Sequence, residues 1–488
     1  MVGLGRQEEG NVSWPSELPE WARIYERSLR EVNGVHLALV RLGEEKRLLL
    51  SQPIPDFPEL EEVAGGFLAP LTFAAAKALQ AILPELRPRR LPEGPSFGFG
   101  DRIGLATPGH IRALSGAKVF PVLAQQSVRE NSRTGRSFQE VLASAVFGAF
   151  QEGYTGGFGA DADHLKSVED ALEAAELGYT FFTCDPSELV VPVERLPEEE
   201  IMARFQALPG AKRLAEAYLG KNIPIKGLGR IRFSERELAA AAVKYLGAVE
   251  FAAEMYSALS EALPEGFDFE LSLDEAATPT SPMEHYLVVS ELLARGVELD
   301  SLAPRFGGAM EKAVDYRGSL EVFRRDLRAH IAIAKVLGTY RISLHSGSDK
   351  FSLYPVLARE AGELWHVKTA GTSYLVALEV VAHHAPELFR EIAEFSLERF
   401  AEDRATYHLS TDLSRIPELG ALPDEDLPRL LEQEDSRQVL HVTFGSVLQG
   451  PLGGELRRVL ALHEEAHYQA LARHLGRHLK ALGVKDDG

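Results

Sequence analysis

The segment "RISLHSGSDK" (341–350) combines a short apolar strand with an abrupt polar ending. Alternation along a strand places Ser343 and His345 on one face and Leu344 on the other. Only small or charged residues follow His345, and a plain turn does not require an imidazole there. We therefore expect His345 to lie at the open end of a barrel, as part of a metal site. The alternative is a histidine that only makes a hydrogen bond at the rim.

Seven further apolar runs, each bounded by Gly, Pro or Asp, follow the same pattern elsewhere in the chain. The eight segments are 96–102, 118–126, 155–164, 179–185, 267–275, 299–306, 340–346 and 364–372. Stretches with helical periodicity separate most of them. Eight strand–helix units predict an α/β fold with a (β/α)8 barrel, whose active site lies at the C-terminal ends of the strands.

Three regions are expected to accompany a barrel that spans residues 95–387. Residues 1–90 form an N-terminal extension that ends in an apolar helix, and 388–488 form a helical region that packs on the barrel. A mostly helical insertion at about 188–245 separates the fourth and fifth strands. This insertion is either a lid or an oligomer contact, and a homo-oligomer is therefore a possible state of the protein.

The composition limits the class of partner. The 488 residues carry a net charge of -20, a negative field that repels nucleic acids and anionic membranes. A small anionic substrate must therefore be bound by local Arg and Lys. The single cysteine, Cys184, excludes an intramolecular disulfide and a Cys-rich zinc site. No apolar stretch has the length of a membrane span or a signal peptide, so we expect a cytoplasmic protein.

The third segment, "GFGADADHLKS" (157–167), places Asp163 beside His164 at a strand end. Small residues around the pair let a ligand approach the backbone, and the pair offers a base beside a metal ligand. The alternative is a turn with an N-capping Asp and a surface His.

The eighth segment, "LWHVKTAGTS" (364–373), places His366 and Lys368 two residues apart and hence on one face of a strand. A lysine inside a barrel is costly unless it is paired or takes part in the chemistry. Its alternative role is to balance acids on neighbouring strands. Thr369 and Thr372 then supply hydroxyl and N–H groups of the kind that hold a carboxylate or phosphate.

The fifth segment, within "FELSLDEAATPTSPMEH" (269–285), carries Glu270, Ser272 and Asp274 on one face, with Glu275 just beyond. Paired carboxylates at a strand end suit general acid–base catalysis or metal ligation. The alternative is a capping role before the next helix.

Basic and polar residues at other strand ends are candidates for binding an anion. Arg305 follows the sixth strand and Lys350 the seventh, and either can clamp an anion or pair with an acid at the rim. Gln125, Ser346 and Asp349 also lie at strand ends and can line the same cavity.

A separate motif, "HEEAH" (463–467), matches the H-E-x-x-H pattern of zinc peptidases and lies on a predicted helix. The extended motif requires His at 473 and Gly at 470, where this sequence has Arg473 and Ala470. A chance match on an amphipathic helix is therefore favoured, and a zinc peptidase is kept as an alternative function.

Several longer strings together resemble one family. They include "FGFGDRIGLATPGH" (97–110), "GADADHLKS" (159–167), "SLHSGSDKFSLYP" (343–355) and "HVKTAGTSYL" (366–375). They are similar to the tagaturonate/fructuronate epimerases, and the resemblance spans about residues 95–450. It implies a metal-dependent barrel isomerase that interconverts two ketohexuronates at C4. The Asp163–His164 pair followed by "HSGS" also resembles the site of class II aldolases.

The resemblance implies a metal site built on His164 and His345. His366 is the first choice for the third ligand, with Glu275 or Asp163 as alternatives. The implied cofactor is a divalent cation, Zn²⁺ first, with Mn²⁺, Co²⁺ and Ni²⁺ as alternatives.

The resemblance also implies catalytic and substrate-binding residues. The expected catalytic residues are Asp163, Asp274, Glu275 and Lys368. The expected substrate-binding residues are Gln125, Arg305, Ser346, Asp349, Lys350, Thr369 and Thr372. Retro-aldol cleavage and carbonyl migration are both open as mechanisms, and a Schiff base on Lys368 would remove the need for a metal. A sugar-acid-binding barrel without catalysis is a second alternative function.

Overall fold

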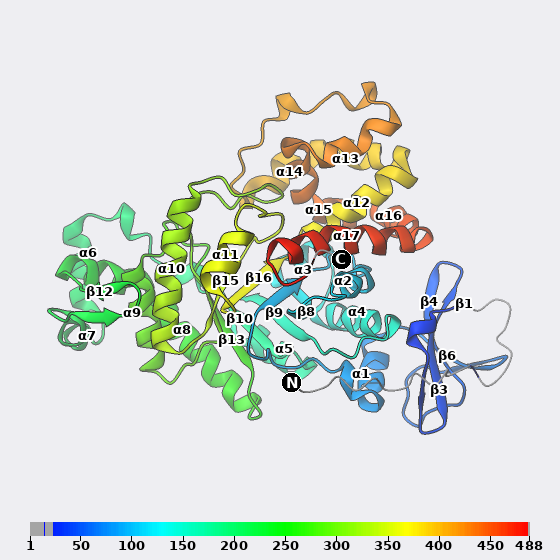
Figure 1. The fold of residues 1–488 in the computed structure, drawn as a ribbon, viewed down its shortest axis with the longest axis horizontal. Coiled ribbons are helices and arrows are strands. Elements are labelled where there is room, and N and C mark those ends of the chain that lie inside the picture. The colour runs from blue at the N-terminus through cyan, green and yellow to red at the C-terminus, as the bar shows by residue number, and fades with distance from the viewer. Residues whose placement is uncertain (1–13, 15–22, 487–488) are drawn as a thin grey trace.

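Eight parallel strands close into a barrel in a computed structural model that describes Trp14 and residues 23–486 (Figure 1). Around the barrel the order is β10, β13, β14, β15, β16, β7, β8, β9. The strands are β7 (Ser96–Phe99), β8 (Phe120–Ser127), β9 (Gly159–Leu165), β10 (Phe181–Cys184), β13 (Asp268–Ser272), β14 (Ser301–Ala303), β15 (Arg341–Leu344) and β16 (Trp365–Thr369). Each coincides with one of the eight predicted segments, so the predicted (β/α)8 barrel is confirmed.

Helices follow the strands and surround the barrel. They are α2 (Thr107–Ala113), α3 (Val128–Thr134), α4 (Phe138–Gln151), α5 (Val168–Leu177), α8 (Glu235–Ala262), α9 (Pro282–Leu293), α10 (Leu320–Leu337), α11 (Tyr354–Ala361) and α12 (Thr372–His384). Capping boxes begin α4, α8 and α9, where Ser137, Ser234 and Ser281 each accept from the backbone three residues on. These caps satisfy N–H groups that a helix start leaves without partners.

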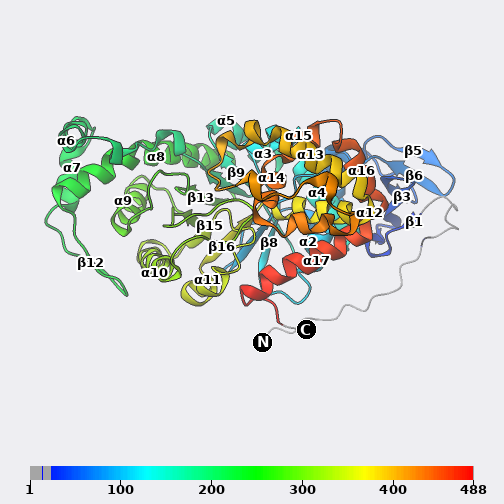
Figure 2. The same cartoon turned by 90° about the horizontal axis from the view of Figure 1, so that it is seen from above.

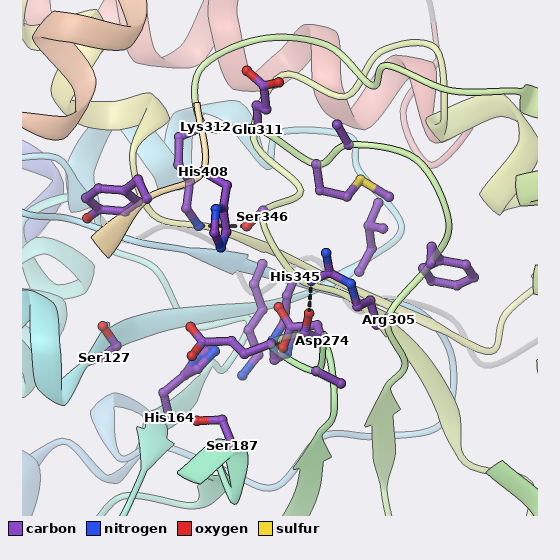
Figure 3. Close-up of a pocket in the computed structure, with 18 of the residues that line it drawn as sticks. Ser127, His164, Ser187, Asp274, Arg305, Glu311, Lys312, His345, Ser346 and His408 are labelled. Carbon is purple, nitrogen blue, oxygen red and sulfur yellow. Dashed lines mark hydrogen bonds and ion pairs between the residues drawn. The ribbon is translucent and has the colours of Figure 1, made fainter. Parts of the chain in front are cut away.

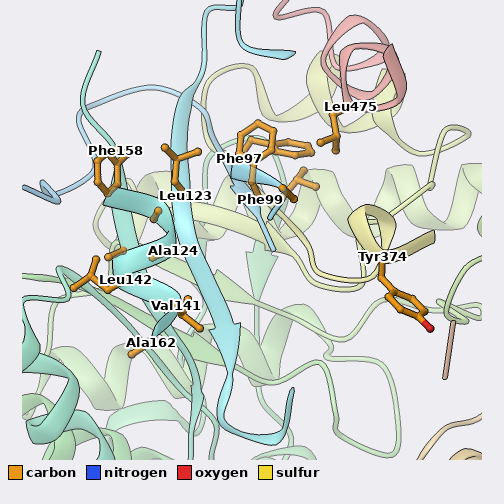
Figure 4. Packing of buried hydrophobic residues seen from close by; sticks show 14 of the residues in the cluster. Phe97, Phe99, Leu123, Ala124, Val141, Leu142, Phe158, Ala162, Tyr374 and Leu475 are labelled. Atoms are coloured by element: carbon orange, nitrogen blue, oxygen red, sulfur yellow. The ribbon is translucent and has the colours of Figure 1, made fainter. Parts of the chain in front are cut away.

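Strand β7 shows how the barrel wall is packed. Phe97 and Phe99 point outward with ring centroids 4.7 Å apart, near Leu475 of α17 (Glu464–Ala481) (Figure 4). Gly98 between them faces inward, where an added Cβ would lie 2.1 Å from the Gln125 side-chain oxygen. A glycine at this position therefore leaves the space that Gln125 occupies in the barrel.

Residues 23–69 form an antiparallel sheet that the sequence analysis did not anticipate. Its strands are β1 (Arg23–Ile24), β2 (Arg30–Val32), β3 (Val35–Leu42), β4 (Glu45–Leu50), β5 (Glu61–Val63) and β6 (Gly66–Ala69). The sheet lies at one end of the molecule in Figures 1 and 2. The expected apolar helix follows as α1 (Phe73–Ile82). Most of the predicted extension before residue 23 lies outside the described residues.

The insertion after β10 contains helices, as expected, and also a β-hairpin. Its elements are η3 (Ser187–Leu189), η4 (Val193–Arg195), α6 (Glu198–Ala207), α7 (Ala211–Tyr218), β11 (Ile223–Ile225), β12 (Gly229–Ile231) and the start of α8. Leu214, Tyr218 and Phe233 belong to a hydrophobic cluster separate from the main core. The insertion therefore shares a small second core with α9 and α10, and it lies at the end of the molecule opposite the N-terminal sheet (Figure 2).

Helices also dominate the chain after the barrel. They are α13 (Pro386–Asp403), α14 (Glu434–Val442), α15 (Phe444–Gln449), α16 (Gly453–Leu462) and α17, with short 3-10 turns between residues 404 and 431. Helix α17 packs along α2 and α12. No helix among the described residues is both long enough and apolar enough to cross a membrane.

We expect Asp268→Asn to raise thermal stability more at pH 8 than at pH 5. Asp268 is fully buried at the start of β13, where its Oδ2 accepts from the backbone N–H of Leu91 at 2.7 Å. Burial, with the nearby Asp300, raises the pKa of Asp268 to about 7, whereas the unfolded group titrates near about 3.9. The folded protein binds this proton more tightly, so its stability falls as the pH rises toward 7.

Thermal unfolding of the parent and the variant at the two pH values measures this effect. The gain in Tm from Asp268→Asn should be a few degrees larger at pH 8, whereas exposed Asp56→Asn should give the same small change at both. An equal gain from Asp268→Asn at both pH values would contradict the expectation.

Candidate functional site

A cavity of about 950 Å³ opens at the C-terminal ends of the barrel strands (Figure 3). Loops that follow the strands form most of its wall, and the segment 407–410 and His441 close the remaining side. The lining holds eight Lys or Arg residues and six Asp or Glu residues, although the whole chain has a net charge of -20. The cavity therefore concentrates positive charge in an acidic protein, as a site for a small anion requires.

An irregularity in β9 lets two adjacent residues enter this cavity. The pairing between β9 and β10 shifts register after Ala162, so that three residue steps on β9 match two on β10. His164 has a φ of 56°, in the left-handed region that residues other than glycine rarely adopt. Such a bulge breaks the alternation of side chains. As a result Asp163 and His164 both line the cavity.

Two imidazoles meet at the mouth of the barrel. The ring centroids of His164 and His345 are 4.9 Å apart. Asp163 Oδ1 lies 2.8 Å from His164 Nδ1, and Glu270 Oε1 lies 2.6 Å from His345 Nε2. The remaining nitrogen of His345, Nδ1, lies 2.9 Å from Asp274 Oδ1 (Figure 3). His164 is thus held by a carboxylate on Nδ1 alone, which leaves its Nε2 for another ligand, whereas both nitrogens of His345 contact carboxylates.

These side chains form a group that can hold a divalent cation. His164, Asp274 and His345 offer three ligand atoms that all lie within 4.8 Å of one another. Two imidazoles and a carboxylate suit zinc and the neighbouring divalent metals. Carboxylates that orient the imidazoles from behind, as Asp163 and Glu270 do, are typical of metal sites.

The charges of the group influence one another strongly. Burial favours a neutral ring, but Asp274 and Glu270 raise the pKa of His345 to about 10. Asp163 likewise raises the pKa of His164 against the effect of burial. Burial opposes ionisation of Asp274, yet His345 keeps the pKa of this carboxyl below its usual range. The carboxylates therefore create a strong preference for positive charge at the centre of the group.

Lys368 lies below this group, within the barrel, and is enclosed by acids. Its Nζ lies 2.7 Å from Asp161 Oδ2, 2.7 Å from Asp163 Oδ1 and 2.9 Å from Glu270 Oε1. It also donates to the Thr183 hydroxyl at 2.5 Å. Burial disfavours the ammonium, but these carboxylates raise the pKa of Lys368 well above its ordinary value. Lys368 is therefore held in its charged form.

His366 lies away from the two imidazoles. It precedes Lys368 by two residues on β16, and its Nδ1 shares a hydrogen bond of 2.8 Å with the Ser96 hydroxyl. Burial lowers the pKa of His366 to about 3. Among the groups of potential metal ligands in the described chain, none includes His366. The structure thus brings Asp274, rather than His366, beside His164 and His345.

Several residues predicted to contact substrate or take part in catalysis line the cavity. These are Gln125, Asp163, Asp274, Glu275, Arg305, Ser346, Lys350 and Lys368. Lys350 has fixed partners, because its Nζ donates to main-chain oxygens of Glu311 at 2.9 Å, Val314 at 2.6 Å and Ser348 at 3.2 Å. Its ammonium therefore holds together the loops after β14 and β15 that form part of the cavity wall.

Asp349, Thr369 and Thr372 do not line the cavity. The hydroxyl of Thr369 donates to the Gly98 carbonyl at 2.7 Å, so it joins two strands. Asp349 accepts from Thr372 Oγ1 at 3.0 Å and from Arg437 Nη2 at 2.6 Å. These three residues support the site from behind its wall.

Asp349 also forms a second group of potential metal ligands, with His474 and His478 of α17. Asp349 Oδ1 lies 2.6 Å from His474 Nε2, and the Asp349 backbone N–H donates to His478 Nε2 at 3.1 Å. The group therefore ties α17 to the loop after β15.

The "HEEAH" motif has structural contacts. His463 stacks on His384 with ring centroids 4.1 Å apart, and Glu464 accepts from the Tyr25 hydroxyl at 2.8 Å. Burial lowers the pKa of His467 to about 4. Within the described residues, neither histidine belongs to a group of three potential ligands. The zinc-peptidase alternative is therefore not supported.

Three residues at the site are not predicted by the sequence patterns. Alternation places Glu270 on one face with Asp274 but indicates no role for it, although it contacts both His345 and Lys368. Arg129, in the first turn of α3, and Lys312, on the loop after β14, also line the cavity. The long segment between β14 and α10 was the available signal for Lys312, because long loops at this end of a barrel carry function.

Comparisons with known proteins find similar epimerases. The model of the tagaturonate epimerase family, UxaE, matches residues 25–482. The chain is 45% identical over 466 residues to the tagaturonate/fructuronate epimerase of Thermotoga maritima, covering 94% of this chain and 96% of that protein. It is also similar to the native crystal structure of the fructuronate-tagaturonate epimerase from Cohnella laeviribosi. There the TM-score is 0.91 at 37% identity, covering 96% of this chain and 97% of that one.

We expect Lys368→Met to destabilise the protein by about 3–5 kcal/mol, because it leaves three buried carboxylates without their counter-charge. Adding Asp161→Asn to this variant should recover part of the loss, since one carboxylate is then removed. Denaturant unfolding of both variants measures the difference, with exposed Lys212→Met as the control. Equal stability of Lys368→Met and the parent would contradict the balancing role.

Proposed function

This chain belongs to the tagaturonate epimerase family, and we propose that it interconverts tagaturonate and fructuronate with a divalent cation bound by His164, Asp274 and His345. The observation that carries the proposal is the close approach of the two imidazoles, 4.9 Å between ring centroids, beside Asp274. The substrate of such an isomerase is a small sugar acid, and the positive lining of the cavity favours an anion.

The residues present fit a bound cation. The carboxylates around His164 and His345 raise the pKa of both rings, so positive charge is favoured where a cation would lie. When bound, the cation would act as a Lewis acid that stabilises negative charge developing on substrate oxygens. Zn²⁺ is the first choice for this donor set, with Mn²⁺, Co²⁺ and Ni²⁺ as alternatives.

The reaction inverts C4 of a 2-ketohexuronate. The hydrogen on C4 is not adjacent to the C2 ketone, so simple enolisation cannot remove it. Cleavage of the C3–C4 bond by a retro-aldol step gives a three-carbon enediolate and a three-carbon aldehyde that keeps the carboxylate. The aldehyde turns its other face to the enediolate, and the C3–C4 bond re-forms with inverted C4. Migration of the carbonyl along the chain is the second route.

The side chains of the cavity suit the retro-aldol route. Glu275 accepts the proton of the C4 hydroxyl during cleavage and returns it to the C4 oxygen when the bond re-forms. Asp163 holds the ring of His164 through Nδ1, and Lys368 holds Asp163 in turn. The cavity of about 950 Å³ leaves room for the aldehyde to turn.

The surroundings of Lys368 argue against the Schiff-base alternative. A Schiff base requires a neutral amine that can attack a carbonyl. The three carboxylates around Lys368 raise its pKa, and its Nζ is enclosed by them and by Thr183. Lys368 therefore acts as a positioning residue in this proposal.

Removal of metal tests the proposed function. Dialysis against a strong chelator should abolish epimerisation of tagaturonate, and adding Zn²⁺, Mn²⁺, Co²⁺ or Ni²⁺ singly should restore it with at least one ion. Elemental analysis of the protein before and after dialysis should show loss of about one ion for each chain, the stoichiometry expected of a single four-coordinate site. Full activity in metal-free protein would overturn the metal-dependent mechanism.

Substitution of individual residues tests which side chains bind the ion. We expect His164→Asn, His345→Asn and Asp274→Asn each to lower metal affinity by at least about tenfold, because each removes one ligand. His366→Asn serves as the matched control and should retain metal affinity, since His366 contacts Ser96 instead. Metal loss in His366→Asn together with retention in Asp274→Asn would reverse the assignment.

A further inference from the structure

The Lys and Arg side chains around the cavity differ in how many of their N–H donors already have partners in the protein. Four have fixed partners: Arg102 donates twice to Glu130, Lys244 contacts Glu284, Lys350 donates to three carbonyls and Lys368 contacts three carboxylates. Arg305 donates to the backbone oxygen of Asp274 at 3.1 Å. The N–H donors of Lys350 and Lys368 are all engaged, so these two side chains have little capacity left for a ligand, whereas Arg305 uses only one of its five donors.

Arg129 and Lys312 retain most of their donors. Lys312 Nζ donates to the Ser346 hydroxyl at 2.6 Å, and no other side-chain partner for it occurs among the described residues. Arg129 Nη1 lies 3.5 Å from Glu275 Oε1, and its guanidinium makes no hydrogen bond to any described residue. Lysine has three N–H donors and arginine five. Both side chains line the cavity and can therefore bind an anion there.

The two cations also act on each other. Burial and the neighbouring Arg129 both lower the pKa of Lys312, so the two positive groups repel one another. Two like charges brought together in a partly buried site are unfavourable unless an anion lies between them. Glu130 and Asp274 counter part of this effect at Lys312, so the anions of the cavity wall partly offset the repulsion. Figure 3 shows Lys312 pointing toward Ser346, above and to the left of His345 and Asp274.

We propose that Arg129 and Lys312 together bind the carboxylate of the sugar-acid substrate. This inference rests on the proposed function and replaces the expectation that Lys350 performs this role, since the three donors of Lys350 are engaged by main-chain oxygens. Bidentate binding by a guanidinium and a point contact from an ammonium suit a carboxylate. Arg129 also lies beside Glu275, so a carboxylate held here would bring the C4 hydroxyl of the same molecule toward that proton carrier.

This placement has a specific advantage for an enzyme that cleaves its substrate and rejoins it. In the retro-aldol route the carboxylate stays on the aldehyde, which is the fragment that must turn. An anchor on the carboxylate keeps that fragment in the cavity while its carbonyl rotates. Lys312 and Arg129 are therefore substrate-binding residues whose contacts persist through the whole reaction.

Steady-state kinetics with tagaturonate test the proposal. Lys312→Met and Arg129→Gln should each raise KM by about tenfold to a hundredfold, which corresponds to the loss of one charge-assisted contact. The value of kcat should change by less than about threefold, because the contact is equally strong before and during the reaction. Lys312→Arg and Arg129→Lys should restore KM to within about threefold of the parent by retaining the charge.

Arg195→Gln is the matched control. Arg195 lines the same cavity but is exposed at its rim, so its removal changes the net charge equally without removing the anchor. We expect its KM to stay within about twofold of the parent, since an exposed charge is largely screened by salt. Metal content and Tm should match the parent in all five variants.

Three results would overturn the inference. They are an unchanged KM in Lys312→Met and Arg129→Gln, an equal rise in Arg195→Gln, or a fall in kcat that the conservative variants do not reverse. A parent enzyme with no activity on either uronate would instead overturn the proposed function, so the two failures are distinguishable.

Discussion

The left-handed backbone at His164 is the constraint on which the site depends. A regular strand would direct Asp163 and His164 to opposite sides of the barrel wall, and only one of them could reach the cavity. The register shift in β9 brings both inward. The imidazole can then approach His345 while Asp163 fixes its Nδ1 and also contacts Lys368. The extra residue in β9 therefore lets Asp163 contact both His164 at the cavity and Lys368 within the barrel.

The second organising feature is the balance of charge inside the barrel. Asp161, Asp163 and Glu270 would repel one another in the barrel, and Lys368 is the counter-charge that lets them remain buried together. Glu270 then has a carboxylate oxygen available for His345. Burial raises the pKa of Asp161 to about 7, so this carboxyl is the member of the set that ionises least readily. Asp163 and Glu270 therefore each contact both the buried Lys368 and one of the two imidazoles.

The sequence predicts the barrel well because each strand is a short apolar run between polar or Gly-rich loops, and eight such runs leave few other topologies. It also draws attention to His164 and His345, which the structure brings together, since an imidazole directly after an apolar run is unusual. Alternation places His366 on the inner face but does not tell how deep it lies, so the sequence could not predict that Asp274 would lie beside the two imidazoles instead. Asp274 is on a loop beyond the strand, where periodicity no longer predicts position.

Sequence patterns also could not predict the N-terminal sheet or the meeting of Arg129 and Lys312 at one cavity. The N-terminal sheet has strands of two to eight residues with many charged side chains, so its apolar signal is weak. Arg129 and Lys312 follow different strands, and only the closed barrel brings them to one cavity. Long-range contacts of this kind depend on the fold, whereas local patterns predict only the elements.

The tie between α17 and the loop after β15 has a consequence for how the enzyme is made. That loop contains Ser346 and Asp349, both with left-handed backbone, and His478 accepts from the Asp349 N–H. His478 is translated 129 residues after Asp349, an interval of roughly ten seconds at about 5–20 residues per second. During that interval the nascent barrel lacks the helix that supports this loop, so ribosome-bound chains should remain inactive until α17 emerges.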